Sequence, residues 1–161
     1  MTAGGSSVPE IQQLLAVLVA AKGGRVAEIG TAYGEGARVI ADSLPSGATF
    51  VTVEQDEERL AVAREKLAGA RVEVLQGMWQ DHLPQRGPFD VLFFDGGQRS
   101  NLDEVIDLLA PGGILVKDDL TPGRPIEGDP TREAFLRNPK LIATELVVRD
   151  DMAAIVAVRK S

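Results

Sequence analysis

The chain of 161 residues has no cysteine and only one histidine, and both shortages limit the kinds of site it can build. Without cysteine it can form neither a disulfide framework nor a thiolate zinc site. The single histidine, His82, stands between Asp81 and Leu83. A lone histidine in such a setting is more often a surface or capping residue than a base, so the main chemistry is expected elsewhere.

Long apolar runs and clusters of basic residues are also missing. The apolar run at residues 14–21 is too short to span a bilayer, and Glu10 rather than a basic cluster precedes it. We therefore expect no secretory signal, no membrane association and a cytoplasmic location. Seventeen Lys and Arg against 24 Asp and Glu give a net charge of −7. Because phosphate backbones are bound by cationic side chains, this balance favours a small-molecule substrate over nucleic acid.

The length suits one domain, without internal repeats or low-complexity segments. Residues 1–7 are rich in Gly and Ser and predict a flexible leader, which leaves residues 8–161 as a single domain. Ser7 with Pro9 can start a helix whose apolar positions recur at helical spacing until Gly23 and Gly24 end it.

After this helix, strand and helix patterns alternate along the chain. Strands are expected at residues 25–29, 49–53, 72–75, 89–94 and 114–116. Helices are expected at residues 36–44, at residues 56–67 with Asp56 as the cap, and at residues 102–109, ended by Pro111-Gly112-Gly113. Such alternation predicts a parallel sheet with right-handed crossovers.

The last part of the chain breaks this alternation. Two apolar runs at residues 141–148 and 152–158 are joined only by Arg149-Asp150-Asp151, which leaves no room for a helix. They predict an antiparallel hairpin. The expected fold is therefore α/β: a Rossmann-like, doubly wound, mostly parallel seven-stranded sheet with a C-terminal antiparallel hairpin.

A glycine-rich turn follows the first strand, in Glu28-Ile29-Gly30-Thr31-Ala32-Tyr33-Gly34. Glycines there let the backbone approach a ligand closely, although an ordinary turn would also contain them. Three residues separate the two glycines, unlike the G-x-G-x-x-G spacing of dinucleotide sites. A carboxylate at Glu28 would repel a pyrophosphate but suits a cofactor with ammonium and sulfonium groups. Glu54, at the end of the second strand, can accept both ribose hydroxyl hydrogen bonds.

Three carboxylates end the fourth and fifth strands. If these strands are neighbours, Asp95, Asp118 and Asp119 converge beside the cofactor. Clustered carboxylates need a compensating cation or proton, and oxygen ligands suit Mg²⁺, Mn²⁺ or Ca²⁺. The alternative is that the three acids cap turns and the next helix. Trp79 is expected either over an adenine ring or in the core, and Tyr33 either lines the site or is simply exposed.

Residues 121–130, dense in Pro and Gly, follow the fifth strand and predict a lid or substrate loop. Arg124 within it either attracts an anionic substrate group or is merely solvated.

The residues from Glu28 to Gly34 resemble motif I of class I S-adenosylmethionine-dependent methyltransferases. Phe94-Asp95-Gly96 and Lys117-Asp118-Asp119 resemble the metal motifs of the catechol-type O-methyltransferases and their bacterial relatives. The resemblance covers the chain from about Pro9. It implies Asp95 and Asp118 as catalytic residues and Asp95, Asp118 and Asp119 as metal ligands, although the third ligand is commonly Asn.

The resemblance also implies a set of cofactor-binding residues, with Glu28 and Gly30 beside the methionine portion, Glu54 at the ribose and Gln80 at the adenine. The full set is Glu28, Gly30, Thr31, Ala32, Tyr33, Gly34, Glu54, Gln55, Gly77, Met78, Trp79, Gln80 and Asp95.

Two features depart from the catechol-type pattern. Gln98 stands where those enzymes usually carry a lysine base, and glutamine cannot take a proton at neutral pH. Little chain precedes the first strand, where relatives use extra helices to build the substrate pocket and a dimer. The oligomeric state is left open, with a homodimer as one option.

The predicted activity is transfer of a methyl group from S-adenosylmethionine to a hydroxyl of a small molecule, assisted by Mg²⁺, Mn²⁺ or Ca²⁺. The alternatives are a metal-independent methyltransferase of another small-molecule class and a non-catalytic cofactor-binding module. A nicotinamide oxidoreductase is disfavoured by the glycine spacing.

Overall fold

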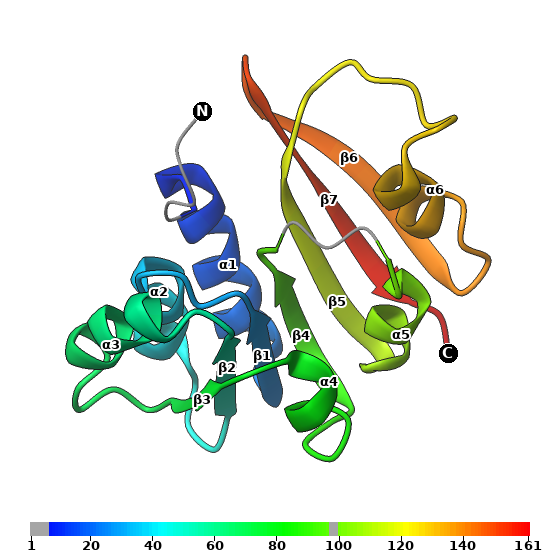
Figure 1. The fold of residues 1–161 in the computed structure, drawn as a ribbon. Helices are drawn as coiled ribbons and strands as arrows, with labels where there is room; N and C mark the ends of the chain where they lie inside the picture. Colours follow the sequence, from blue (N-terminus) through cyan, green and yellow to red (C-terminus); the bar gives the residue numbers. More distant parts are fainter. Residues whose placement is uncertain (1–6, 97–99) are drawn as a thin grey trace.

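The computed structural model describes residues 7–96 and 100–161. Within them, seven strands form one sheet in the order β3-β2-β1-β4-β5-β7-β6 (Figure 1). The strands are β1 (Arg25–Ile29), β2 (Thr49–Glu54), β3 (Glu73–Gln76), β4 (Phe89–Phe94), β5 (Leu109–Leu120), β6 (Leu141–Arg149) and β7 (Met152–Arg159). The helices are α1 (Pro9–Lys22), α2 (Glu35–Ser43), α3 (Glu57–Lys66), α4 (Trp79–His82), α5 (Leu102–Asp107) and α6 (Pro130–Leu136).

Strands β3, β2, β1, β4 and β5 run parallel, and β7 runs antiparallel to both of its neighbours, β5 and β6. This arrangement confirms the predicted doubly wound sheet and its terminal hairpin. The strand order reverses between β1 and β4, because the chain first builds outward from β1 to β3 and then returns to β4. A crevice outside the carboxyl ends of the strands at such a point is where open α/β sheets bind ligands.

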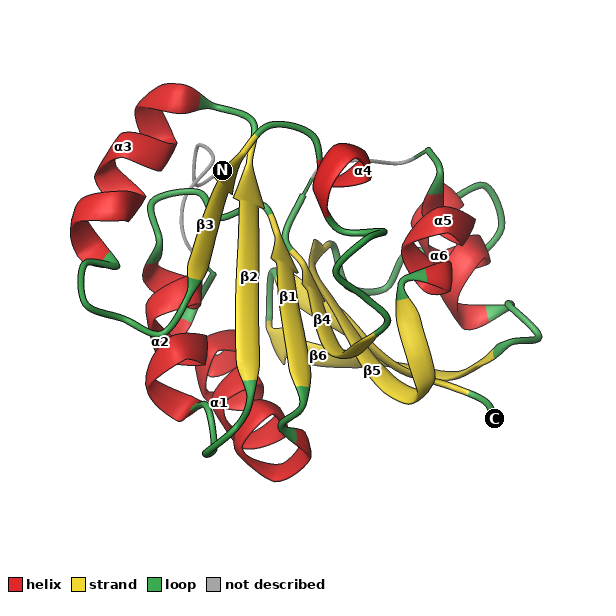
Figure 2. Ribbon diagram, turned by 90° about the horizontal axis from the view of Figure 1, so that it is seen from below, coloured by secondary structure: helices red, strands yellow, loops and turns green. Residues whose placement is uncertain are grey.

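Helices cover both faces of the sheet, with α1, α2 and α3 on one side and α4, α5 and α6 on the other (Figure 2). Successive residues of a strand point to opposite faces, so each central strand contributes to two separate cores. In β4, Val91 and Phe93 belong to the core beneath α1, whereas Leu92 and Phe94 belong to the other. This double burial explains why β4 is apolar apart from Asp90.

The start of β5 differs from the sequence-based prediction. Helix α5 ends at Asp107, and β5 begins at Leu109 and continues through Pro111-Gly112-Gly113, which was expected to lie outside any strand. The register against β4 shifts between Phe89 and Val91, so the extra residues are accommodated as an irregularity in the ladder. A Cβ on Gly113 would lie 2.6 Å from the carbonyl oxygen of Phe89, so glycine permits this close pairing.

Two helices were not predicted. Helix α4 is a single turn, too short to show helical periodicity. Helix α6 begins at Pro130 and is capped by Asp129, whose Oδ1 accepts hydrogen bonds from the backbone N–H groups of Thr131 and Arg132. Asp followed by Pro is a helix-start signal, which the surrounding Pro and Gly residues obscured. The predicted lid is therefore shorter and ends at Asp129.

Of the two residues expected to cap helices, Asp56 does so and Ser7 does not. Asp56 caps α3 by accepting a hydrogen bond from the Arg59 backbone N–H at 3.0 Å, as expected. The expected Ser7 cap is wrong, because Val8 occupies the cap position of α1 and makes no side-chain cap bond. Ser7 is instead buried. Across the described residues, no helix is both long and apolar enough to cross a membrane.

Candidate active site

The glycine-rich turn brings the carboxyl ends of β1 and β4 into close contact. Gly30 has a φ of +93°, and a Cβ on it would lie 1.8 Å from the carbonyl oxygen of Asp95. The Asp95 N–H also donates to the Ile29 carbonyl oxygen at 2.9 Å, which extends the β1–β4 pairing beyond the strands. Any side chain at residue 30 would therefore push these two strand ends apart.

Glu54 is held by the two turns that flank it. Its Oε2 accepts a hydrogen bond from the Ala32 N–H at 2.9 Å, and its Oε1 accepts one from the Asp56 N–H at 3.0 Å. Ala32 has a φ of +48°, an uncommon conformation for a residue with a Cβ. The carboxylate is thus oriented by backbone donors, and each oxygen keeps capacity for a further hydrogen bond.

A cleft of about 220 Å³ opens at this edge of the sheet, where the strand order reverses. Its wall contains Ile29, Gly30, Val53, Glu54, Gln55, Arg59, Gly77, Trp79, Phe94, Asp95 and Gly96. These residues come from the ends of β1, β2, β3 and β4 and from the starts of α3 and α4. The cleft includes Gly30, Glu54, Gln55, Gly77, Trp79 and Asp95 from the predicted cofactor set.

The other predicted cofactor residues are not part of the wall of this cleft. Thr31 is buried, and Gly34 starts α2 with a φ of +89°. Met78 is 41% exposed. Gln80 contributes to the wall of a second cavity, of about 410 Å³, between α4 and α5. Trp79 is 2% exposed and lines both spaces, so it belongs to the core and to the site at once.

Glu28 is a buried acid on β1, only 1% exposed. Its Oε1 accepts a hydrogen bond from Thr52 Oγ1 at 2.6 Å, and the Thr52 hydroxyl lies 2.6 Å from that of Thr31. Burial raises the pKa of Glu28 to about 8, against the opposing effect of the Thr52 hydrogen bond, and the charges of Asp95, Asp118 and Glu54 raise it further. A cation nearby would offset this accumulation of negative charge.

Asp95 and Asp118 extend the acidic edge toward β5. Burial, followed by the charge of Asp118, raises the pKa of Asp95, while burial raises that of Asp118 to about 6. Lys117 opposes both shifts; its Nζ lies 5.2 Å from the Phe94 ring centroid and donates to the Asp118 carbonyl oxygen at 2.8 Å.

Comparison with known proteins identifies the chain. Residues 27–120, more than half of the sequence, match the family described as a methyltransferase domain. The chain belongs to this methyltransferase family. A search of the curated proteins finds no match.

Solved structures show the same fold over nearly the whole methyltransferase. An O-methyltransferase from Bacillus cereus, in complex with SAH, is 26% identical, with a TM-score of 0.81 over 96% of this chain and 83% of that chain. Cofactor-bound Rv0187 from MTB is 27% identical, with a TM-score of 0.81 over 97% of this chain and 82% of that chain. The O-methyltransferase TomG from Streptomyces achromogenes, in complex with SAM, shares the fold at 23% identity, with a TM-score of 0.79 over 100% and 84% of the two chains.

The three acids predicted as metal ligands are not arranged alike in the methyltransferase. Asp118 is 2% exposed, whereas Asp119 has a φ of +61° and an exposed side chain. The β5–β7 register shifts between Lys117 and Leu120, so the strand bulges at these two acids. Among the described residues, no group of three or more His, Cys, Asp and Glu side chains could hold a metal ion. Gln98, the expected departure from the catechol-type pattern, lies outside the described residues.

Sequence reasoning missed three residues of the site. Thr52 and Lys117 sit inside strands, where alternation marks them as buried but does not show what they contact. Arg59 lies one helical turn beyond Asp56 and enters the cleft from α3. A polar residue in an otherwise apolar strand is the one signal that could have found Thr52 and Lys117.

Neither His82 nor the predicted lid contributes a residue to the cleft wall. His82 is the last residue of α4, and its Nε2 lies 2.9 Å from the Gln76 carbonyl oxygen. The segment 121–129 leaves the carboxyl end of β5 and returns to α6 (Figure 1). Arg124 within it is exposed.

Proposed function

We propose that the protein transfers a methyl group from S-adenosylmethionine to a hydroxyl oxygen of a small molecule. The observation that carries the proposal is the cleft at the switch point of the sheet, where Gly30 leaves no room for a side chain and Glu54 presents an oriented carboxylate. The Bacillus cereus and Streptomyces achromogenes structures, which contain SAH and SAM, support this choice of cofactor.

The charges of the site fit that cofactor. S-Adenosylmethionine carries a sulfonium and an ammonium group. Asp95 lies in the cleft wall and interacts electrostatically with Glu28 and Asp118, and the pKa values of all three acids are raised. Cationic groups beside these carboxyls would stabilise their ionised forms. A pyrophosphate would add negative charge beside the same acids, which favours a methionine cofactor over a dinucleotide.

Different residues of the chain are assigned to the cofactor and to the methyl acceptor. When bound, the cofactor supplies an electrophilic methyl group. Glu54 and the Gly30 turn orient the adenosine side, while the buried Glu28 adds negative charge that acts on Asp95 in the cleft wall. Asp95, in the cleft wall, would take the proton that the acceptor hydroxyl loses when its oxygen receives the methyl group, with S-adenosylhomocysteine as the leaving product. Positioning of the two reacting atoms supplies most of the acceleration in such a transfer.

We propose the metal-independent form of this reaction, because the exposed Asp119 does not join Asp95 and Asp118 in a ligand set. Thermal melts with Mg²⁺, Mn²⁺ and chelator test this point in the parent and in Asp118→Asn. We expect no metal-dependent shift in either protein. A rise with Mg²⁺ in the parent that disappears in Asp118→Asn would establish a metal site instead.

Calorimetric titration tests the cofactor. S-Adenosylmethionine and S-adenosylhomocysteine are expected to bind with one-site isotherms, and NAD is not. Binding of NAD, with no detectable binding of S-adenosylmethionine or S-adenosylhomocysteine, would overturn the proposal. Transfer of a labelled methyl group to a panel of hydroxylated small molecules then separates an enzyme from a non-catalytic cofactor-binding module. The small-molecule acceptor, the cytoplasmic location and the homodimer stay predictions.

A further inference from the structure

We propose that Arg59 binds the ribose diol of the cofactor opposite Glu54, and that Tyr33 holds the Arg59 guanidinium in position for this contact. The inference rests on the proposed function, since it assigns residues for the same cofactor. It gives a role to Arg59, which motif I does not include, and an indirect role to Tyr33.

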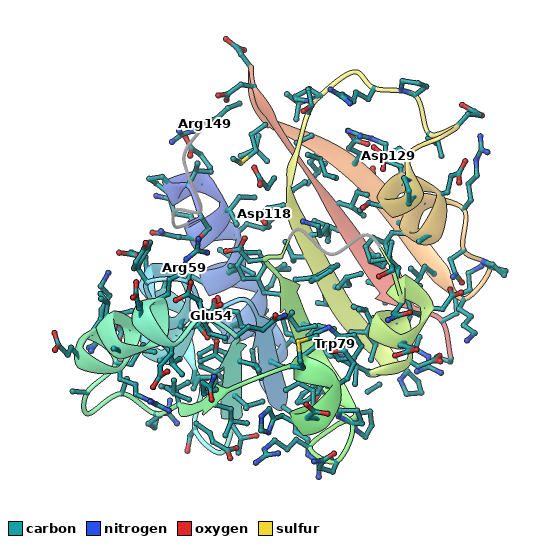
Figure 3. All side chains as sticks on the ribbon, in the orientation of Figure 1. Glu54, Arg59, Trp79, Asp118, Asp129 and Arg149 are labelled. Atoms are coloured by element: carbon teal, nitrogen blue, oxygen red, sulfur yellow. The ribbon has the colours of Figure 1, made fainter. Side chains whose placement is uncertain are left out.

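Arg59 reaches the cleft from the first turn of α3. It forms part of the same wall as Glu54 and Gln55, and Figure 3 shows Arg59 and Glu54 close together near the ends of β1 and β2. Its side chain is 38% exposed, and its Nε lies 3.8 Å from Asp56 Oδ2, near the limit of an ion pair. Asp56 Oδ1 is already used by the Arg59 backbone N–H. The guanidinium therefore keeps N–H donors available to a ligand.

The hydrogen-bonding needs of a diol match the two side chains. Each ribose hydroxyl can donate one hydrogen bond and also accept. Glu54 can only accept, and each of its oxygens already receives one backbone N–H, which leaves lone pairs for the hydroxyl protons. The hydroxyl oxygens then need donors. Arg59 is the one cationic side chain among the described residues that line the cleft, and its fork has only donors.

Tyr33 fixes the direction of the Arg59 guanidinium. The Arg59 guanidinium carbon lies 5.8 Å from the centroid of the Tyr33 ring, within the range of a cation–π interaction. Tyr33 is 37% exposed and follows Ala32, whose N–H holds Glu54. The glycine-rich turn therefore orients the Glu54 carboxylate through its backbone and the Arg59 guanidinium through the Tyr33 ring. This arrangement makes Tyr33 a positioning residue that acts through Arg59.

The test is calorimetric titration with S-adenosylhomocysteine and with its 3′-deoxy analogue. Arg59→Met is expected to weaken binding of S-adenosylhomocysteine about tenfold, because a charged donor is lost. The variant should also discriminate less against the 3′-deoxy analogue than the parent does. Tyr33→Leu should reproduce part of both effects, whereas Tyr33→Phe, which keeps the ring, should match the parent.

Arg64→Met is the matched control, since Arg64 is an exposed arginine of α3 outside the cleft wall. Thermal melts confirm that each variant is folded. The inference is wrong if Arg59→Met binds S-adenosylhomocysteine as Arg64→Met does, or if the penalty for the missing hydroxyl is the same in Arg59→Met as in the parent. In both cases the parent still binds the cofactor, so the proposed function stands. A parent that binds neither methionine cofactor overturns the proposed function together with the inference.

Discussion

At the scale of single residues, the site is dominated by acids that the fold removes from water. Glu28 is the most buried of them and has one hydroxyl partner, Thr52. Glu54 is only partly buried, and two backbone N–H groups hold it. The two acids should therefore respond differently to substitution, one through stability and the other through ligand affinity.

Glu28→Gln is expected to make the protein more stable above neutral pH. The pKa of Glu28 is about 8 in the folded protein and 4.5 in the unfolded chain, so unfolding releases a proton at pH values between these two. The free energy of unfolding therefore falls as pH rises through this window. The variant should exceed the parent by at least about 1 kcal/mol at pH 8.5 and match it at pH 4.5 in denaturant titrations. Glu58→Gln, an exposed acid, is the control; equal pH slopes for Glu28→Gln and the parent would contradict this account.

Glu54→Ala is expected to weaken cofactor binding by about 1.5–3 kcal/mol, the range for hydrogen bonds to a charged group. The fold should persist, because Glu54 lies at the end of β2 and contributes no apolar contact to either core. Calorimetry with S-adenosylhomocysteine measures the loss, with Glu57→Ala as an exposed neighbour for comparison. Unchanged affinity in a folded Glu54 variant would mean that this carboxylate does not contact the ligand.

At the scale of elements, one buried arginine joins α6, β6 and the end of β5. Arg132 is 1% exposed. Its Nε and Nη2 donate to the two carboxylate oxygens of Glu145 at 2.8 and 2.7 Å, and its Nη1 donates to Asp129 Oδ2 at 2.6 Å. Its Nη2 also donates to the Thr121 carbonyl oxygen at 2.7 Å. Both ends of the segment 121–129 are therefore attached to the same guanidinium.

Arg132→Met should destabilise the protein by at least about 1.5–3 kcal/mol, the range for a hydrogen bond to a charged group, because it leaves the partly buried carboxylates of Glu145 and Asp129 without their partner. Urea titration measures the loss. Arg86→Met is the control, since Arg86 makes a similar two-pronged pair with Glu73 at the surface, where such pairs contribute about 0–1 kcal/mol. Faster cleavage after Glu127 by a glutamate-specific protease in Arg132→Met would show that the segment has been released. Similar losses in both variants would contradict the role given to Arg132.

At the scale of the whole molecule, two apolar cores on opposite faces of one sheet support a polar edge. Carboxylates from β1, β2, β4 and β5 meet there because the carboxyl ends of parallel strands share one edge. A cofactor bound in the cleft contacts segments from several parts of the chain at once. Binding should therefore stabilise the fold as a unit.

Saturating S-adenosylhomocysteine is expected to raise the free energy of unfolding by about 2.7 kcal/mol at a concentration 100 times its Kd. The melting temperature should rise with the logarithm of ligand concentration, as differential scanning fluorimetry would show. The same titration on Glu54→Ala should give a smaller rise at each concentration. A shift that is independent of ligand concentration would point to a solvent effect instead of binding.

The sequence by itself determined the features that depend on local pattern. β1 and β4 were predicted with the bounds that the structure has, because buried strands show as short apolar runs whatever surrounds them. The hairpin of β6 and β7 followed from two apolar runs and a three-residue joint. Glu54 and Asp95 were located because Glu54 ends β2 and Asp95 directly follows β4, and strand ends in a parallel sheet share one edge.

Only the tertiary structure decided the features that depend on contact between distant residues. Pro111-Gly112-Gly113 looked like a break, but pairing with Phe89 draws it into β5. Asp118 and Asp119 looked like equivalent ligands until the bulge against β7 buried one and exposed the other. Thr52 meets Glu28 from a neighbouring strand, and Arg59 meets Tyr33 from a separate helix. These contacts join residues more than twenty positions apart, and local periodicity carries no information about which distant partners the sheet brings together.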